Sequence, residues 1–443
     1  MKPMSTNTED DPNFVKWFRS VAPYFHAFRG KTFVIAFGGE VVADGKFAVL
    51  AHDINLLQAA GIRIVLVHGS RPQIETQLKQ RRAKARYKDG LRITNAVALE
   101  CVKEAVGLLR VEIDALLSQG LPNSPMAGAA INTVSGNFIT AQPHGIRDGV
   151  DFQYTGLVRK IDVTAINGCL DASNIVIISN VGYSPTGEVF NLAMEDVAVV
   201  TARSLGAAKL LFLTDEPVRN SKGDIVTELS VDEGEALIGG ESGLTDDTRL
   251  YLAHAMEAVR GGVPRAHLVS HRVDGSLLIE LFTHDGSGSM LTAKGVERLR
   301  PATIDDVGGI LQLIEPLESD GTLVYRGREM LEREVTRFFV VEHDGMIVGC
   351  AALYPFPKGR TAELAAVAIR PEYRRLGYGE KLLDAISERA RQQGLRKLIV
   401  LTTLATHWFI ERGFSLGNVS SLPEPKRSLY NWQRRSKILI KNL

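Results

Sequence analysis

The sequence has few cysteines, almost no net charge and no long apolar run. Its three cysteines, Cys101, Cys169 and Cys350, lie far apart and follow no metal-binding spacing, which favours buried thiols in a reducing cytoplasm. A formal net charge of +1 excludes a broad basic field for nucleic acid or anionic membranes. No apolar run approaches the ~20 residues that span a bilayer, and the polar residues 1–12 make a secretory signal unexpected. We therefore expect a cytoplasmic protein that binds neither nucleic acid nor membrane.

What the sequence does have is enough length for two or three domains. It contains 443 residues, of which 45% are hydrophobic and 23% are charged, as is ordinary for a globular protein. The pattern of apolar runs changes near residue 297. We therefore predict an N-terminal segment over 1–30, a first domain over 31–290, a linker over 291–298 and a second domain over 299–443.

In the first domain, short apolar runs alternate with helical stretches. Strands are predicted over 32–37, 63–67, 175–178, 209–213 and 267–269, with a helix over 47–60. Strands that alternate with helices imply an α/β fold with a mainly parallel sheet covered on both faces. Gly38-Gly39 and Gly69 come just after the ends of the first two strands, the usual ligand side of such a sheet.

The second domain contains a glycine-rich turn between a strand and a helix. Strands are predicted over 338–342, 346–353, 363–369 and 397–402, and a helix over 405–413. The turn is Arg374-Arg375-Leu376-Gly377-Tyr378-Gly379, and an amphipathic helix starts after it. Glycines let a backbone approach a ligand, and a helix start offers free N–H groups and a positive dipole end, so the turn is suited to a phosphate.

Over about 145 residues, this order of elements resembles the GNAT-type acetyltransferases, which hold acetyl-coenzyme A at such a turn. The likeness implies that the turn binds the pyrophosphate and that a strand N–H of Ala366 or Val367 polarises the acetyl carbonyl. It assigns the coenzyme to Ala366, Val367, Ala368, Arg374, Arg375, Leu376, Gly377, Tyr378 and Gly379. No metal is needed for this chemistry, and the scattered histidines show no ligand spacing.

The first domain resembles the amino-acid-kinase fold and, within it, the N-acetylglutamate kinase branch. This resemblance implies a three-layer sandwich. The likeness rests on 33–39, 66–74, 187–191 and Leu213-Thr214-Asp215. Kinases of the family carry a lysine where this chain has Ala36, and the bulky Arg71 follows Gly69-Ser70. Because phosphoryl transfer needs cations to offset charge on the moving group, we expect this domain to have lost kinase activity.

The stretch from His267 to Met290 is similar to the arginine-binding site of arginine-sensitive acetylglutamate kinases. The likeness places the guanidinium at Glu280 and the other end of arginine near Lys209, Tyr24 and Ser289. The implied site comprises Tyr24, Lys209, His267, Glu280, Gly288 and Ser289. Taken singly, Glu280 could instead be a solvated carboxylate at a strand end, and Lys209 a cation at a helix end.

The N-terminal segment carries apolar residues at helical spacing. Phe14, Phe18, Val21, Phe25 and Phe28 form one stripe, and Pro23 is expected to kink the helix. The stripe could pack on its own domain. The family resemblance favours pairing with the same helix of another subunit, as in hexameric relatives, and implies a homo-hexamer.

A kinase-like domain ahead of a GNAT domain resembles the bacterial N-acetylglutamate synthase family. The likeness implies acetyl transfer from acetyl-coenzyme A to L-glutamate at the first step of arginine biosynthesis, with L-arginine as feedback inhibitor. Removing a proton from the substrate ammonium requires a general base, for which we choose Glu363, directly or through water. Thr402 or Tyr430 would protonate the departing thiolate. The alternatives are that Glu363 is a strand-edge carboxylate and Thr402 an ordinary β-branched strand residue.

Two substrate carboxylates need cations, and guanidinium groups suit them. The family match places the substrate at Val324, Arg326, Arg434 and Ser436. Which arginine binds which carboxylate is open, and an arginine near the C-terminus is by itself more often a solvated charge. Two other functions also remain open: a first domain that keeps kinase activity, and an arginine-binding module whose acetyltransferase half is a relic.

Overall fold

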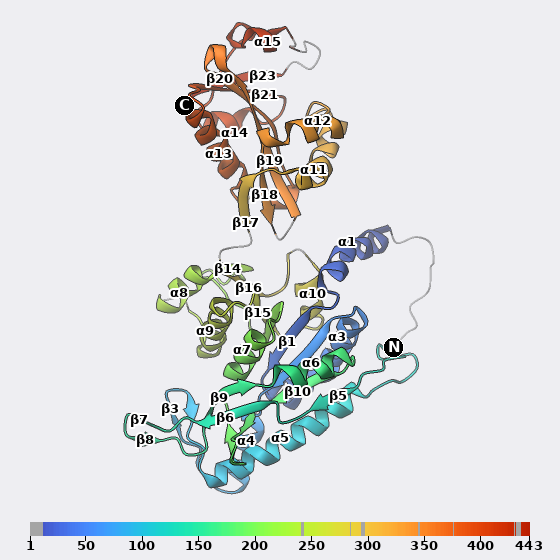
Figure 1. Cartoon of the computed structure of the whole chain (residues 1–443), viewed down its shortest axis with the longest axis vertical. Coiled ribbons are helices and arrows are strands. Elements are labelled where there is room, and N and C mark those ends of the chain that lie inside the picture. The colour runs from blue at the N-terminus through green and yellow to red at the C-terminus, as the bar shows by residue number, and fades with distance from the viewer. Residues whose placement is uncertain are drawn as a thin grey trace. The chain divides into compact units, whose positions relative to one another are not determined.

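The chain divides into two compact structural units, and the boundary lies between residues 295 and 296 (Figure 1). The computed structural model describes residues 12–240, 243–283, 285–293, 297–343, 346–374, 376–428, 430 and 436–443. The division falls inside the predicted linker 291–298, whose ends are occupied by the strands β16 (Ser289–Thr292) and β17 (Glu297–Pro301). Among the described residues, no helix has the length and apolarity needed to cross a membrane.

The first unit is built on one large sheet. Among the described residues its eight strands, in spatial order, are β14 (Glu228–Ser230), β16, β15 (Ala266–Ser270), β13 (Lys209–Thr214), β1 (Thr32–Phe37), β2 (Arg63–His68), β10 (Ile175–Ser179) and β5 (Thr133–Ser135). Neighbours are parallel except β15 and β16, which are antiparallel. The mainly parallel sheet predicted from the alternating strands and helices is therefore confirmed.

Helices cover both faces of this sheet because its strands are apolar on both sides. In β1, Phe33, Ile35 and Phe37 enter one hydrophobic core, whereas Val34 and Ala36 enter the other. One face carries α1 (Pro12–Phe28), α2 (Glu40–Ala43), α3 (Phe47–Ala59), α5 (Ala96–Leu117) and α10 (Ser276–Phe282). The other carries α6 (Val163–Asp171), α7 (Met194–Ser204), α8 (Val231–Gly239) and α9 (Asp246–Arg260). These three layers are the predicted sandwich.

Smaller elements complete the first unit. A four-stranded sheet contains β12 (Val189–Asn191), β11 (Val181–Tyr183), β6 (Ile139–Pro143) and β9 (Gly156–Ile161). Two short hairpins are β3 (Tyr87–Lys88) with β4 (Leu91–Arg92), and β7 (Ile146–Arg147) with β8 (Val150–Asp151). Helix α4 (Arg71–Gln80) packs on α5 through Ile74 and Leu78.

The second unit is a mixed sheet with helices on both faces. In spatial order, its strands are β17, β18 (Phe338–His343), β19 (Met346–Phe356), β20 (Thr361–Ile369), β21 (Lys397–Thr402), β23 (Lys437–Asn442) and β22 (Ser415–Leu416). Its helices are α11 (Val307–Ser319), α12 (Arg328–Glu334), α13 (Tyr378–Gln392), α14 (Thr406–Glu411) and α15 (Glu424–Arg427). Short 3-10 turns are η1 (Ile304–Asp306), η2 (Val335–Arg337), η3 (Pro357–Gly359), η4 (Pro371–Tyr373) and η5 (Val419–Ser421).

The pair β20 and β21 is parallel, and the other paired neighbours in this sheet are antiparallel. Helices α11 and α12 pack on one face of the sheet, and α13 and α14 on the other. This is the α/β arrangement that the second half of the sequence predicts.

Candidate functional site

The parallel strands β20 and β21 separate at Glu363. Their pairing runs from Thr361 opposite Lys397 to Glu363 opposite Ile399, while β20 continues to Ile369. Beyond Glu363, the described register of β20 involves only its other neighbour, β19. The open side of β20 can therefore present backbone N–H and C=O groups to an extended ligand that enters as an added strand.

A β-bulge interrupts β20 within this open segment. Cys350 pairs with Ala368 and Ala352 with Ala365, so Ala366 and Val367 together lie opposite Ala351. Ala366 has a φ of 51°, a left-handed conformation that costs a non-glycine residue on the order of 1–3 kcal/mol. The Cys350 thiol donates to the Ala366 carbonyl over 3.3 Å. A bulge leaves an N–H outside the ladder, as a donor to an acetyl carbonyl requires.

Glu363 lies where the two strands part. It is only 7% exposed, and its register partners Tyr354 and Ile399 share its face of the sheet. This is the face of α12 and of the apolar cluster around Leu422. Because β20 is a central strand, Glu363 is not the strand-edge carboxylate of the alternative interpretation.

Lys426 of α15 is the partner of Glu363. Its Nζ lies 2.8 Å from Oε2 of Glu363, and its side chain is more exposed than the carboxylate. Nothing in the sequence pointed to Lys426, because the two positions lie far apart in the chain. This ion pair places a cation directly beside the carboxylate that we choose as the base.

The two predicted thiolate donors lie on opposite faces of the sheet. Tyr430 packs on the cluster around Leu422, on the side of Glu363, and donates to the Ser436 carbonyl over 2.8 Å. Thr402 ends β21 on the face of α13, by its alternation with Val400. Its hydroxyl oxygen accepts from the N–H groups of Leu404 (3.3 Å) and Ala405 (3.0 Å), which leaves its own proton free to be donated.

Arg326 reaches the face that carries Glu363. Its Nη1 donates to the Val324 carbonyl over 2.8 Å, which fixes the local turn, and Val324 itself is exposed. Burial raises the pKa of the Tyr354 phenol to about 12, with a hydrogen bond to Glu334 adding to this and Arg326 opposing it. Since Tyr354 is paired with Glu363, the guanidinium is close to the proposed base. Ser436 is buried nearby, and Arg434 lies outside the described residues.

The predicted phosphate turn leads directly into α13. Gly377 has a φ of 76° and caps this helix, whose first hydrogen bonds run from the N–H groups of Glu380 and Lys381 to its carbonyl. The N–H groups of Tyr378 and Gly379 precede those bonds and face an incoming anion. The Tyr378 ring is buried and its hydroxyl contacts His343 over 3.0 Å, so only its backbone serves the turn.

The rest of the turn is exposed, with one side chain packed against it. Arg374 and Leu376 are exposed, and Arg375 lies outside the described residues. A Cβ atom on Gly379 would come within 3.0 Å of the Trp408 ring, which explains a glycine there. Arg412, which sequence reasoning missed, stacks on Trp408 with its guanidinium 4.3 Å from the ring centroid. Arg412 thereby holds the Trp408 ring in place against the start of α13.

In the first unit, three of the predicted arginine-site side chains form one buried chain of contacts. Lys209 Nζ lies 3.1 Å from His267 Nε2, and His267 Nδ1 lies 2.6 Å from Glu280 Oε1. Glu280 Oε2 accepts from the N–H groups of Ser287 (2.9 Å) and Gly288 (2.8 Å). Glu280 is on helix α10 and Lys209 begins strand β13, both buried, so the two surface alternatives for them are wrong.

Burial and neighbouring charge set the protonation of this chain. Burial lowers the pKa of Lys209 to about 7, and Arg265 lowers it further against the pull of Glu280. Burial likewise lowers the pKa of His267 to about 4. Burial alone would raise the pKa of Glu280, but hydrogen bonds from His267, Ser287 and Gly288 outweigh it and hold it at about 2. The neutral imidazole therefore links a carboxylate to a lysine that titrates near neutrality.

Tyr24 and Arg265 border the same chain, whereas the Ser289 hydroxyl does not. Lys209 Nζ lies 5.2 Å from the Phe28 ring centroid, and Tyr24 packs on that ring at 5.9 Å. The sequence prediction did not include Arg265. It lies two residues before His267, so the alternation of side chains places it on the same face. The Leu210 N–H donates to its carbonyl.

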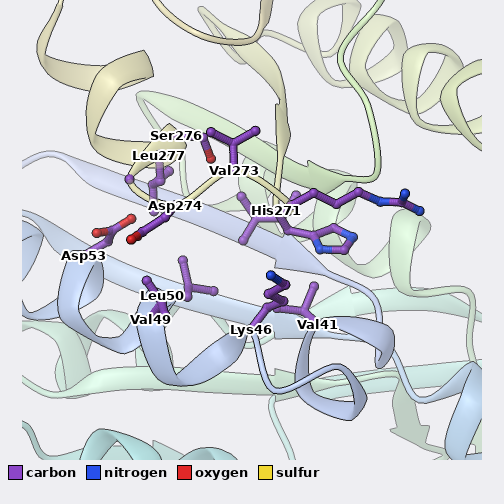
Figure 2. A pocket seen from close by; sticks show the side chains of 13 residues that line it. Val41, Lys46, Val49, Leu50, Asp53, His271, Val273, Asp274, Ser276 and Leu277 are labelled. Carbon is purple, nitrogen blue, oxygen red and sulfur yellow. The ribbon is translucent and has the colours of Figure 1, made fainter.

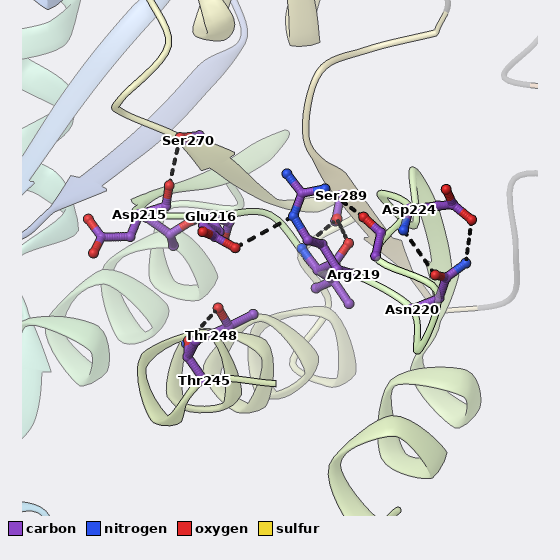
Figure 3. A network of polar contacts seen from close by, with 12 residues as sticks. Asp215, Glu216, Arg219, Asn220, Asp224, Thr245, Thr248, Ser270 and Ser289 are labelled. Carbon is purple, nitrogen blue, oxygen red and sulfur yellow. Dashed lines mark hydrogen bonds and ion pairs between the residues drawn. The ribbon is translucent and has the colours of Figure 1, made fainter. Parts of the chain in front are cut away.

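Ser289 pairs with Leu268, so its side chain lies on the opposite face from His267. Its hydroxyl accepts from Val218 N–H over 2.9 Å, beside the loop shown in Figure 3. Only the backbone of Ser289 remains close to the predicted arginine site, because one step along a strand reverses the side-chain direction.

The kinase-like positions are occupied by packing and by internal hydrogen bonds. Ala36 is fully buried between Val67 and Phe212 in the sheet, so it offers no cation. Ser70 donates to Asn180 over 2.8 Å, Asn180 donates to Asn191, and Asn191 donates to Thr94 over 3.0 Å. Polar groups that satisfy one another in this way are not left open for a phosphate.

Comparison with known proteins gives the same two halves. Residues 31–270 match the amino acid kinase family, and residues 310–414 match the acetyltransferase (GNAT) family. An amino-acid acetyltransferase of Ralstonia nicotianae is 55% identical over 438 residues, which cover 98% of this chain and 97% of that protein.

Two solved structures of N-acetylglutamate synthase from Neisseria gonorrhoeae are 37% identical and cover 97% of this chain and 99% of theirs. The complex with coenzyme A and L-arginine has a TM-score of 0.89, and the complex with coenzyme A and N-acetyl-glutamate has one of 0.62. With both halves and nearly the whole length matched, the chain belongs to the amino-acid acetyltransferase family of N-acetylglutamate synthases, in which an amino-acid-kinase domain precedes a GNAT domain.

Proposed function

We propose that this acetyltransferase transfers the acetyl group of acetyl-coenzyme A to the amine of L-glutamate and that L-arginine inhibits it by binding to the kinase-like domain. The observation that carries the catalytic half is the buried carboxylate of Glu363 at the point where β20 and β21 part. The complexes of the Neisseria gonorrhoeae relative with coenzyme A, L-arginine and N-acetyl-glutamate support the choice of ligands.

The described residues fit the coenzyme. Its pyrophosphate would meet the N–H groups of Tyr378 and Gly379 at the start of α13, with Arg374 close by. The amide-containing arm would run along the open side of β20. The acetyl carbonyl would accept from an N–H at the Ala366–Val367 bulge, which offsets negative charge as the tetrahedral intermediate forms.

In this reaction the substrate nitrogen must lose two protons, and the departing thiolate must gain one. Glu363 takes a proton from the glutamate ammonium, directly or through water, and the free amine then attacks the thioester carbon. As the tetrahedral intermediate collapses, the C–S bond breaks and the thiolate takes a proton from Tyr430 or Thr402. The second proton of the attacking nitrogen replaces the one that this hydroxyl gave up. Tyr430 shares the face of Glu363, which favours it slightly, but its hydroxyl is engaged with the Ser436 carbonyl.

The substrate carboxylates would meet cations that gather on the same face. Arg326 supplies a guanidinium near Tyr354, and we keep Arg434 for the second carboxylate from the family match. Lys426 is a further cation within reach of the substrate, because it already contacts the base. A substrate carboxylate that draws Lys426 away would leave Glu363 free to accept a proton.

For the effector, Glu280 would bind the guanidinium and the carbonyl of Gly288 would take a further donor. Lys209 begins β13, Arg265 immediately precedes the adjacent strand β15, and both would meet the arginine carboxylate. Inhibition further requires that arginine binds two arrangements of the enzyme with different affinity.

Arginine affinity is expected to fall as pH rises above 7. Free Lys209 has a pKa of about 7, and a bound carboxylate stabilises its charged form, so binding takes up a proton above that pH. The dissociation constant should increase by up to about tenfold per pH unit between pH 7 and 8.5 and stay flat below pH 6. Isothermal titration calorimetry in buffers of different ionisation enthalpy measures both the affinity and the proton.

The matched control is Lys209→Arg, whose guanidinium stays charged over the whole range. It should bind arginine with little pH dependence. A wild-type affinity that is constant from pH 6 to 8.5 would contradict the assignment of Lys209 to the carboxylate.

A thiol-release assay tests the proposed reaction. Release of free coenzyme A from acetyl-coenzyme A should require L-glutamate and should decrease when L-arginine is added. If none of the amino acids tested causes release of coenzyme A, the transferase proposal is rejected. Measuring ATP consumption with N-acetylglutamate in parallel tests the kinase alternative, which the burial of Ala36 opposes.

The oligomeric state stays a prediction. The two halves of helix α1 differ in burial. Val21 and Phe28 are buried against their own unit, whereas Phe14, Trp17 and Phe18 are more than half exposed. We propose that the exposed half pairs with the same helix of a second copy in a homo-hexamer, which light scattering measures directly. A cytoplasmic location and the absence of a metal requirement likewise remain predictions, as do the domain boundaries at 30, 290 and 298.

A further inference from the structure

A small cavity lies at the end of the first unit's sheet away from Lys209 and His267. It has a volume of about 80 Å³ and is lined by helix α3 and the loop between β15 and α10 (Figure 2). Leu213 and His271 border it at the carboxyl ends of β13 and β15, whereas Lys209 begins β13. The cavity is therefore separate from the predicted arginine site.

A buried carboxylate lines this cavity without a partner. Asp53 is 7% exposed and has no hydrogen bond or ion pair to any of the described residues. His271 uses Nε2 to contact Asp215 over 2.9 Å, while its buried Nδ1 has no partner among the described residues. Because buried polar groups are nearly always hydrogen-bonded, a carboxylate without a partner on the wall of a cavity points to a ligand with a polar group of its own.

Charge is divided across the cavity. Figure 2 shows Asp53 and Asp274 at one end and Lys46 and His271 toward the other. Burial, together with the smaller effect of the nearby Asp274, raises the pKa of Asp53 to about 7. No described cation neutralises this carboxylate pair, so the acidic end lacks a positive partner. The opposite end offers an ammonium and an imidazole.

The cavity is small. A cavity holds roughly one water per 10–15 Å³ of such space, so about 80 Å³ has room for roughly five to eight. That is close to the number of non-hydrogen atoms in the smallest amino acids.

We propose that this cavity binds a small zwitterionic α-amino acid, with its ammonium toward Asp53 and Asp274 and its carboxylate toward Lys46 and His271. The ammonium supplies the cation that the acidic end lacks. The carboxylate would meet the Lys46 ammonium and the His271 ring at the other end. Leu50 and Leu277 form apolar walls beside the small side chain.

Equilibrium binding to the full-length protein tests the proposal with glycine and L-alanine as probes. Isothermal titration calorimetry at pH 8 should detect binding of at least one of them, with a dissociation constant below about 10 mM. Ethylammonium and acetate, which carry only one of the two charges, should bind at least about tenfold more weakly.

Asp53→Asn is the informative variant, because it keeps the shape of the side chain and removes its charge. Probe affinity should fall at least about tenfold. Lys46→Met, at an exposed position, should also weaken binding and cannot disturb the core. Glu280→Ala and saturating L-arginine serve as controls for the effector site and should leave probe binding unchanged. Thiol release with glutamate should be the same in Asp53→Asn as in the wild type, so this proposal can fail while the proposed reaction stands.

The pH dependence gives an independent check. Asp53 is faced by Asp274, Lys46, His271 and Arg272, and its own deprotonation strengthens the acidic end. Probe affinity should therefore rise between pH 6 and 8, opposite to the fall expected for arginine. Wild-type protein that binds neither probe, or Asp53→Asn that binds them as well as the wild type, would overturn the proposal.

Discussion

Replacing Glu363 with glutamine is expected to lower the turnover number at neutral pH by about 10²–10⁴-fold, the usual contribution of a general base. The amide cannot accept the ammonium proton, while its size and its place between Tyr354 and Ile399 are kept. Steady-state thiol release measures the loss, and calorimetry with coenzyme A should give unchanged affinity. The defect should shrink as pH rises, because the glutamate amine then loses its proton without help.

Lys426→Met is the matched control for this prediction. If Glu363 served only as the partner of Lys426, removing the ammonium would harm the enzyme as much as removing the carboxylate. A base predicts a different result: Lys426→Met should retain most of its turnover number and show a raised KM for glutamate. Turnover of Glu363→Gln equal to that of the wild type would reject the catalytic role.

Glu280→Ala is expected to abolish inhibition by arginine and leave thiol release without arginine unchanged. Truncating one partner of a buried, hydrogen-bonded charge pair typically costs about 2–5 kcal/mol, so arginine affinity should fall at least about 30-fold. The side chain is 4% exposed and holds the backbone at Ser287 and Gly288. Inhibition curves and calorimetric titration with arginine measure the effect.

Glu280→Gln separates charge from loop geometry. One amide oxygen can still accept from Ser287 or Gly288 N–H, so the loop is retained while the negative charge is lost. It should lose most of the arginine affinity as well. Full inhibition of both variants by arginine would show that the guanidinium binds elsewhere.

Much of the fold follows from local sequence. The strand over Thr32–Phe37 and the strand over Lys397–Thr402 are found at the predicted residues, because a continuous apolar run that is bounded by turn residues has few other ways to be buried. The turn before α13 is also found where it was predicted, because Gly377 adopts a positive φ at the helix cap. These features depend on neighbours in the chain.

Other parts of the sites depend on contacts between distant segments. The approach of Lys426 to Glu363, the place of Arg265 beside Lys209 and the turn of the Ser289 hydroxyl toward Val218 each follow from strand register or from the path of a loop. A shift of one residue in register would move these side chains to the other face, and no local pattern records that choice.

The sequence by itself therefore determined the two α/β halves, the glycine turn and the residue types that acetyl transfer and arginine binding require. Only the tertiary structure decided that Glu363 lies at the parting of β20 and β21, that Ala366 forms a bulge there, and that Asp53 faces a cavity. The physical reason is that apolar pattern and turn chemistry act over a few residues, whereas burial, ion pairing and pKa arise from whatever the packed chain brings within a few ångströms.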